Sequence, residues 1–398
     1  MPEWEIEHRD HDYNLLGRFK PANELVINRN KNAPSSATYD LARSDPMLTQ
    51  DCFAPYRTDC YIYRDDELII SGPHTSRSWD NENEGVISVG MLDWMHLTEK
   101  LYYPVPITGG TTIDVDIRKG SYYDWMPHDS DIPIVANPYA HIFPEPGALD
   151  DIVKAICTER NAIDDIQWNV YVMNNGGNIP TRIPYVLAAL DGKSMYTYIS
   201  ELSQHDGGFD WDVLWQSHNN LRIRLWYPKR EDLDPTVFFD NSSQFAKFKW
   251  TDEGPIAART YGLGQGHGTV TRLADVSIYA PSEAVYRELE IQEDFGDLAD
   301  SYQYSTFVDE EDRTIARKTG ARGNINRGPK HTIECSFLTS VLGFNFWTQM
   351  GPGTKINIDF DFEFHRVNHD YLMLGYEATI NSGGDELIKP DLQRVSPN

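Results

Sequence analysis

The chain has no long apolar run and only four cysteines among its 398 residues. It contains no stretch near the roughly 20 apolar residues that a membrane-spanning helix needs, so stable membrane insertion is not expected. Its N-terminus is polar and acidic, unlike a secretory signal, which predicts synthesis in the cytoplasm. The cysteines form no CxxC pair, and a disulfide between Cys52 and Cys60 is not expected in a reducing cytosol.

Basic residues are also scarce. The chain has 35 lysines and arginines against 61 acidic residues, which gives a net charge of −26. This charge repels phosphate backbones, so sequence-specific nucleic-acid binding is not expected. The same sign suits a wall past which DNA slides without sticking, but on charge alone an ordinary soluble protein is the favoured interpretation.

The sequence motifs of common active sites and metal sites are missing. The glycine run at 262–268 has no GK[ST], and its glycines favour a turn or a β-bulge over a phosphate loop. No GxSxG occurs, and the glutamate of HExxH is absent between His365 and His369. The acidic and histidine-rich segment at 8–12 is typical of an exposed turn. We therefore expect no catalytic residue, no cofactor and no metal site.

One catalytic alternative stays open at this point. Glycosidases use two carboxylates that face a cleft beside aromatic side chains. The chain places four aspartates near tryptophans in the sequence: Asp164, Asp165, Asp210 and Asp212, beside Trp168, Trp211 and Trp215. Abundance does not establish placement, so an enzyme is not the favoured interpretation.

The first part of the chain is rich in predicted strands. Segments 60–73 and 74–90 predict two successive hairpins, which turn around 65–66 and 81–85, and a short helix follows before Pro104. Earlier segments with alternating apolar residues predict further short strands. With 12% aromatic residues, this pattern favours a small barrel or sandwich.

Four segments follow from composition and periodicity. Apolar residues at helical spacing predict a helix from 149 to 156, and Ser194 is a favourable N-cap for a second helix. A hairpin at 208–228 follows the second helix. We predict a mainly β (α+β) fold in four parts: a first β-barrel at 1–103, a Pro/Gly-rich linker or arm at 104–146, an inserted α+β domain at 147–247 and a second β-barrel at 248–398.

The clearest strand pattern lies near the C-terminus. At 355–364 apolar side chains alternate with polar ones, so Asp359, Asp361 and Glu363 share one face of a strand. One face packs against a core and the other meets water, a channel or another subunit. These three acids are therefore our candidates for a lumen or a subunit seam.

Two charge blocks of opposite sign adjoin each other. Residues 283–312 carry eleven acids and one arginine, and residues 313–330 carry six bases and no acid. Such blocks pair within a fold or between neighbouring copies, and the simpler alternative is two solvated loops. The candidate subunit-contact residues are Arg313, Arg317, Lys318, Arg322, Arg327 and Lys330.

The order of these units resembles a known family. The hairpins and helix at 59–104, the helix and hairpin at 194–227 and the turn at 352–360 resemble tail-hub proteins of siphophages. The order is similar to that of the minor tail proteins of phages that infect actinobacteria. The arm at 104–146 departs from the compact family pattern.

This resemblance implies a structural protein of the virion. Its members form homotrimers in which each subunit supplies two tube-like barrels, so that three chains match a hexameric tail. The implied partners are the distal tail protein, the tape-measure protein and other tail-tip proteins, and the implied place is the tail tip. The implied role is to join the tail tube to the tip and to form a conduit for tape measure and DNA. The alternatives are a tail-tip carbohydrate-binding or cell-wall-degrading protein and a hexameric distal tail protein.

Overall fold

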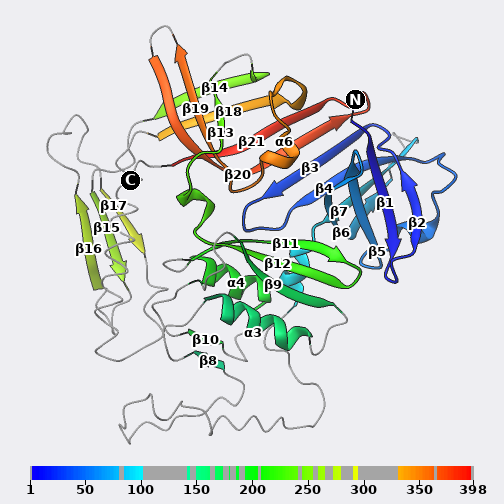
Figure 1. Cartoon of the computed structure of the whole chain (residues 1–398), viewed down its shortest axis with the longest axis horizontal. Coiled ribbons are helices and arrows are strands. Elements are labelled where there is room, and N and C mark those ends of the chain that lie inside the picture. Colours follow the sequence, from blue (N-terminus) through cyan, green and yellow to red (C-terminus); the bar gives the residue numbers. More distant parts are fainter. Residues whose placement is uncertain are drawn as a thin grey trace, which may run out of the picture. The chain divides into compact units, whose positions relative to one another are not determined.

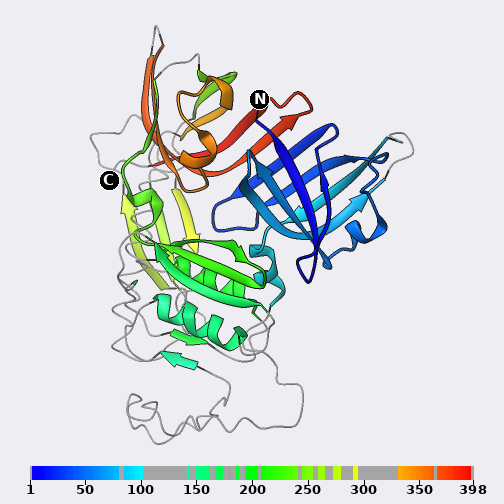
Figure 2. The same cartoon turned by 45° about the vertical axis from the view of Figure 1, so that its right-hand side comes forward.

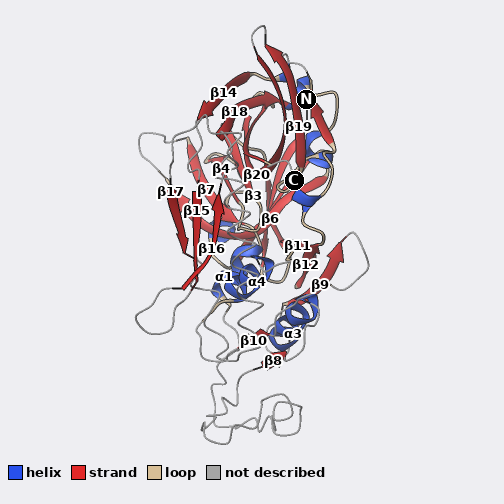
Figure 3. Cartoon of the chain, turned by 90° about the vertical axis from the view of Figure 1, so that its left-hand side faces the viewer, coloured by secondary structure: helices blue, strands red, loops and turns tan. Residues whose placement is uncertain are grey.

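Most elements of the computed structural model are strands (Figure 3). The structure describes the following residues: 2–79, 85–101, 141–143, 149–161, 166–173, 179, 185–187, 193–204, 208–240, 244–253, 259–264, 272–278, 290–294, 330–362 and 365–395. They divide into a larger unit (Met1–Ala246, Ser336–Asn368 and Leu372–Asp391) and a smaller unit (Lys247–Cys335, His369–Tyr371 and Leu392–Asn398). Among these residues, no helix is long and apolar enough to cross a membrane. The mainly β fold is confirmed, and the four-part division stays a prediction.

The N-terminal strands of the larger unit form one curved sheet (Figures 1 and 2). Their order is β3-β4-β7-β6-β5-β1-β2, and all neighbours are antiparallel. This order ends at β2, so a closed barrel is not confirmed. The strands are β1 (Trp4–Asp10), β2 (Leu15–Phe19), β3 (Glu24–Asn30), β4 (Ser36–Ala42), β5 (Thr58–Arg64), β6 (Glu67–Ser78) and β7 (Val86–Leu92).

The two predicted hairpins share a strand. The sequence predicts separate strands before and after Gly72-Pro73, but β6 runs continuously from Glu67 to Ser78. Its first half pairs with β5 and its second half with β7, with a register irregularity between His74 and Ser76. A Cβ atom at Gly72 would lie 2.0 Å from the carbonyl oxygen of Leu92, so only glycine permits this close passage. The break predicted there is wrong because a glycine at a close approach has the same local signature as a glycine in a turn.

The middle of the chain forms a small α+β layer in the same unit. Its elements are α1 (Met95–Lys100), α3 (Leu149–Asn161), β9 (Gln167–Met173), α4 (Met195–Gln204), β11 (Asp210–Ser217) and β12 (Asn220–Trp226), beside the two-stranded pair β8 (His141–Phe143) and β10 (Tyr185–Leu187). The predicted helix at 149 is confirmed, since Leu149, Ile152, Val153 and Ile156 are all buried. Ser194 caps α4 by accepting the backbone N–H of Thr197 at 3.2 Å.

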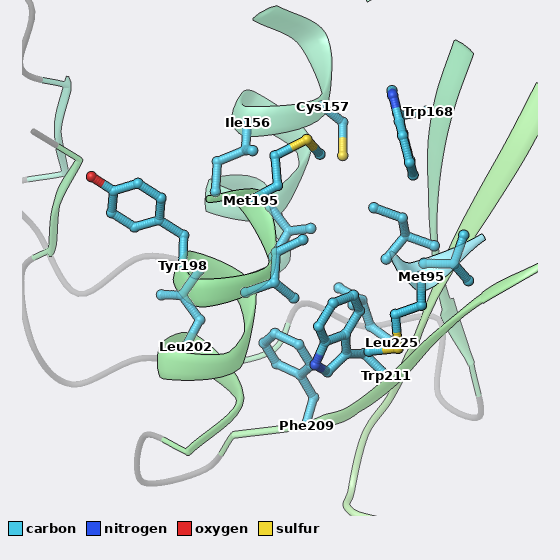
Figure 4. Packing of buried hydrophobic residues seen from close by; sticks show 14 of the residues in the cluster. Met95, Ile156, Cys157, Trp168, Met195, Tyr198, Leu202, Phe209, Trp211 and Leu225 are labelled. Atoms are coloured by element: carbon cyan, nitrogen blue, oxygen red, sulfur yellow. The ribbon is translucent and has the colours of Figure 1, made fainter. Parts of the chain in front are cut away.

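Helix and strand side chains interdigitate in the core of this layer. Trp168 and Trp211 from the sheet pack with Ile156 and Leu202 from the helices in one buried cluster (Figure 4). β12 pairs with β11 as the predicted hairpin, and it also pairs in parallel with β9. The parallel pairing leaves one face of the three strands for the helices and the other face for polar side chains.

The C-terminal strands join the N-terminal sheet. β20 (His365–Asn381) pairs antiparallel with β3, from Gly375 opposite Asn30 to Asn381 opposite Glu24. A Cβ atom at Gly375 would lie 2.5 Å from the carbonyl oxygen of Arg29, so this contact also requires glycine. Further elements of this part are β13 (Val237–Phe239), α6 (Phe346–Gln349), β19 (Lys355–Phe362) and β21 (Glu386–Arg394). Strand β18 (Lys330–Leu338) pairs with β21 through Phe337 and Leu338.

The smaller unit is also built of strands. It contains β14 (Lys247–Glu253) and a three-stranded sheet of β15 (Arg259–Gly264), β16 (Arg272–Ile278) and β17 (Glu290–Asp294). The register of β15 and β16 shifts between Gly262 and Leu263, which agrees with the β-bulge predicted at the glycine run. The rest of that run lies outside the described residues.

A buried glutamate ties the C-terminal strands to the N-terminal sheet. The side chain of Glu386 is 1% exposed, and its Oε1 accepts from Trp4 Nε1 at 3.1 Å and from Arg64 Nε at 2.6 Å. Its Oε2 accepts from Thr339 Oγ1 at 2.5 Å and from Trp347 Nε1 at 3.0 Å. A carboxylate removed from water is tolerated only where donors replace that water, and here donors from four segments do so.

We expect the substitution Glu386→Ala to lower the free energy of unfolding by about 3 kcal/mol or more, because it leaves Arg64 and two indole N–H groups without their acceptor. Urea denaturation followed by tryptophan fluorescence measures this change. The control is Glu377→Ala in β20, which removes an exposed pair with Lys389 and should change stability by less than about 1 kcal/mol. Equal effects of the two substitutions would contradict the role of Glu386.

Candidate functional surface

The predicted acidic face of β19 exists and is partly neutralised. Ile356, Ile358 and Phe360 are buried, so Asp359 and Asp361 lie on the opposite face of the strand. Arg366 of β20 holds Asp359 in a bidentate ion pair, with distances of 2.9 Å from Nε to Oδ1 and 2.6 Å from Nη2 to Oδ2. These hydrogen bonds from Arg366 lower the pKa of Asp359. Asp361 is exposed, and Glu363 lies outside the described residues.

Only the last of the predicted subunit-contact bases is described. Lys330 is the first residue of β18. The other five, and the acidic block that precedes them apart from β17, lie outside the described residues. Pairing between the two blocks therefore stays a prediction.

The two described aspartates of the glycosidase alternative, Asp210 and Asp212, form ion pairs and hydrogen bonds within the larger unit. Asp210 is buried, and its Oδ1 lies 3.0 Å from Lys31 Nζ. Its Oδ2 accepts the backbone N–H of Arg230 at 2.9 Å. Asp212 forms a bidentate ion pair with Arg224 on the neighbouring strand. Asp164 and Asp165 lie outside the described residues. The two described aspartates therefore both lie in ion pairs, and the glycosidase alternative stays a prediction.

Asp210 also marks a joint that the sequence did not predict. The turn between β3 and β4 contacts β11 through Asn32, whose Oδ1 accepts the backbone N–H of Trp211 at 2.8 Å. Tyr196 of α4 donates its hydroxyl to the carbonyl oxygen of Asn32 at 3.1 Å. Asn32 has a φ of +53°, a conformation that asparagine tolerates better than most residues. A local turn signal was present, but its docking site could not be read from the sequence.

Candidate metal ligands do not cluster among the described residues. No group of three or more histidine, cysteine or acidic side chains with the geometry of a metal site occurs in the part of the chain that the structure describes. His365 and His369 both lie in β20. All four cysteines are buried and free, and burial raises the pKa of the Cys60 and Cys157 thiols to about 12.

Two partly or fully buried groups in the N-terminal sheet have shifted pKa values. Burial lowers the pKa of His8 to about 4, and the neutral ring lies 2.9 Å from the carbonyl oxygen of Cys52 and 2.7 Å from the Tyr39 hydroxyl. Burial raises the pKa of Asp59 to about 7, and nearby His11 partly opposes this rise. Asp59 therefore titrates near neutral pH in the folded protein.

The raised pKa of Asp59 predicts a stability difference that depends on pH. The folded state binds this proton more tightly than the unfolded state, whose pKa is near 3.8, so the stability from protonated Asp59 is lost as the pH rises through about 7. The stability of Asp59→Asn relative to the wild type should therefore increase by about 2 to 3 kcal/mol between pH values of about 5 and 8. Urea denaturation at each pH measures this difference. Asp12→Asn, in an exposed turn, is the control, and a constant difference for Asp59→Asn would contradict the prediction.

No family model matches the chain, and no curated protein matches its sequence. Solved structures do match the fold. One is the tail protein from Neisseria meningitidis MC58, with a TM-score of 0.57 and 9% identity over 99% of this chain and 97% of that one. A second is the 43 kDa tail protein of prophage MuSo2 from Shewanella oneidensis, with a TM-score of 0.56 and 12% identity over 99% and 98% of the two chains.

A third is the prophage tail protein gp18 from Listeria monocytogenes EGD-e, with a TM-score of 0.51 and 11% identity over 97% of this chain and 94% of that one. At these identities the likeness concerns the fold, and the actinobacteriophage type stays a prediction. The chain is thus similar over nearly its whole length to phage tail proteins, and the predicted resemblance is confirmed at the level of the fold.

Proposed function

We propose that this chain is a structural subunit of a phage tail tip, acting as a hub between the tail tube and the tip. The observation that carries the proposal is the near-complete match in both directions with three tail proteins, whose fold this chain shares over almost its whole length. Fold alone does not determine function, so the described surfaces must also suit this role. They include the exposed acidic face of β19, where Asp359 pairs with Arg366.

In this proposal three copies form a ring that contacts the distal tail protein above and holds the end of the tape measure. The ring contains two barrels from each subunit and encloses a passage for tape measure and DNA. The net charge of −26 supports a passage that DNA does not adhere to. The exposed Asp361 and the neighbouring pair of Asp359 with Arg366 face this passage or a seam between subunits.

Mass photometry of the purified protein tests the assembly. We expect a species with three times the chain mass of 45.6 kDa. A species of six copies would favour the distal tail protein alternative instead. A monomer at every concentration, together with release of sugars from cell walls, would contradict the hub and favour the enzyme.

Charge reversal tests the acidic face. In phage particles we expect the double substitution Asp359→Lys and Asp361→Lys to block tail assembly or slow DNA ejection, because it places lysines beside Arg366 and in the proposed passage. The matched control is Glu377→Lys with Asp391→Lys, which makes the same charge change on β20 and β21. Thermal unfolding of both variants checks that they fold. Normal assembly and normal ejection in the Asp359 and Asp361 variant would contradict the assignment of this face.

A further inference from the structure

Three side chains form a hydrogen-bonded relay at the surface of the larger unit. The hydroxyl oxygen of Tyr56 lies 3.2 Å from Nε2 of His96, and Nδ1 of the same ring lies 2.7 Å from Oε2 of Glu99. Tyr56 precedes β5, and the other two residues lie one turn apart on α1. A hydroxyl, an imidazole and a carboxylate in this order are the parts of an activated nucleophile.

The chemistry of the three groups determines the direction of the two hydrogen bonds. An ionised carboxylate can only accept, so when the ring of His96 is neutral its single N–H lies on Nδ1, which donates to Glu99. Nε2 then carries the lone pair and accepts the hydroxyl proton of Tyr56. His96 is therefore oriented as a base toward the phenol.

Packed residues at the start of α1 fix the position of His96. His96 is 7% exposed, and the residues before it anchor α1: Trp94 donates its Nε1 to Ser71 Oγ at 2.9 Å, and Met95 is buried in the core of the α+β layer. The relay thus rests on packed residues, so the base cannot easily turn away from the phenol.

The phenol is accessible and its backbone is strained. Tyr56 is 55% exposed and has a φ of +57°, the left-handed region that bulky side chains rarely adopt. Its backbone N–H donates to the carbonyl oxygen of His74 at 2.9 Å, which fixes this conformation. Strained residues that the surrounding structure maintains are often found at functional sites.

We propose that Tyr56 is a nucleophilic modification site that accepts an acyl group from an activated ester. The phenol oxygen attacks the carbonyl carbon while its proton passes to Nε2 of His96. The tetrahedral intermediate then collapses with cleavage of the ester C–O bond, and the proton leaves with the alcohol or phenol of the donor. The product is an acyl ester of Tyr56, and no oxidant or reductant is needed. Glu99 acts as a positioning residue, which orients the ring and stabilises the imidazolium.

This site goes beyond the structural role proposed above and does not depend on it. Tyr171 of β9 offers an internal comparison, because it is 41% exposed and its ring contacts the guanidinium of Arg222 at 4.1 Å. Both phenols are exposed enough to react with a small reagent. Of these two tyrosines, Tyr56 is the one whose hydroxyl has a hydrogen bond to a histidine among the described residues.

Acetylation by 4-nitrophenyl acetate tests the proposal on the full chain. The release of 4-nitrophenolate gives the rate, and peptide mass spectrometry gives the modified residue. We expect Tyr56 to be acetylated about 100-fold faster than Tyr171, the size of a typical general-base effect. Tyr56→Phe should remove the fast phase and leave the labelling of Tyr171 unchanged.

Variants of the relay separate a chemical role from a structural one. His96→Gln should slow labelling of Tyr56 to the rate of Tyr171. Glu99→Ala should slow it partly, and Glu99→Gln should recover part of the loss, since its amide oxygen still accepts from Nδ1–H. The labelling rate of Tyr171 in each variant reports whether the fold is retained, and Glu99, on the partly exposed side of α1, provides variants even where His96→Gln does not fold. Labelling of Tyr56 at the rate of Tyr171, or a fast rate that the Glu99 variants leave unchanged, would overturn the proposal.

Discussion

The pairing of β3 with β20 is the constraint on which the larger unit depends. It joins residues 24–30 to residues 375–381, so one sheet contains strands from the early and the late parts of the sequence. Leu25, Ile27, Ala378 and Ile380 are buried along this pair, and Gly375 allows the two backbones to approach. Closing so long a loop lowers chain entropy, and burial of apolar surface together with a full ladder of backbone hydrogen bonds offsets this loss. The strands beyond β3 and β20 then extend the sheet in both directions.

Two buried carboxylates add contacts between segments to those of the β3–β20 strand pairing. Glu386 collects donors from β1, β5 and the segments around α6, and Asp210 collects Lys31, Asn32 and Arg230. Removing such a charge from water is unfavourable unless several donors replace it, so each carboxylate favours the arrangement that brings its donors together. In a tail subunit these joints would keep the sheet and the α+β layer in a defined relation within the larger unit.

The exposed sites differ in character from these joints. On β19 the acids face outward, and one of them is neutralised by an arginine from the next strand. At Tyr56, a strained backbone and a packed helix bring a phenol to a histidine. A structural fold can carry such a site, because chemistry resides in local constellations and not in the topology that supports them. The acidic face of β19 and the Tyr56 site are therefore separate surfaces with different chemistry.

Local pattern determined much of the secondary structure. Alternation at 355–360 predicted which side chains of β19 are buried, helical spacing predicted the buried face of α3, and Ser194 predicted the start of α4. These features depend on residues within a few positions of one another, so the sequence alone encodes them. The acidic face of β19 followed from the same alternation, although its partner Arg366 did not.

The tertiary structure decided everything that depends on distant residues. The continuity of β6 past Gly72, the parallel pairing of β9 with β12 and the joint of β3 with β20 have no local signal. The relay is the sharpest case, because 40 residues separate Tyr56 from His96 and neither belongs to a motif. Period and propensity are properties of neighbours along the chain, whereas partners across the sheet are chosen by packing and hydrogen bonding in the folded state.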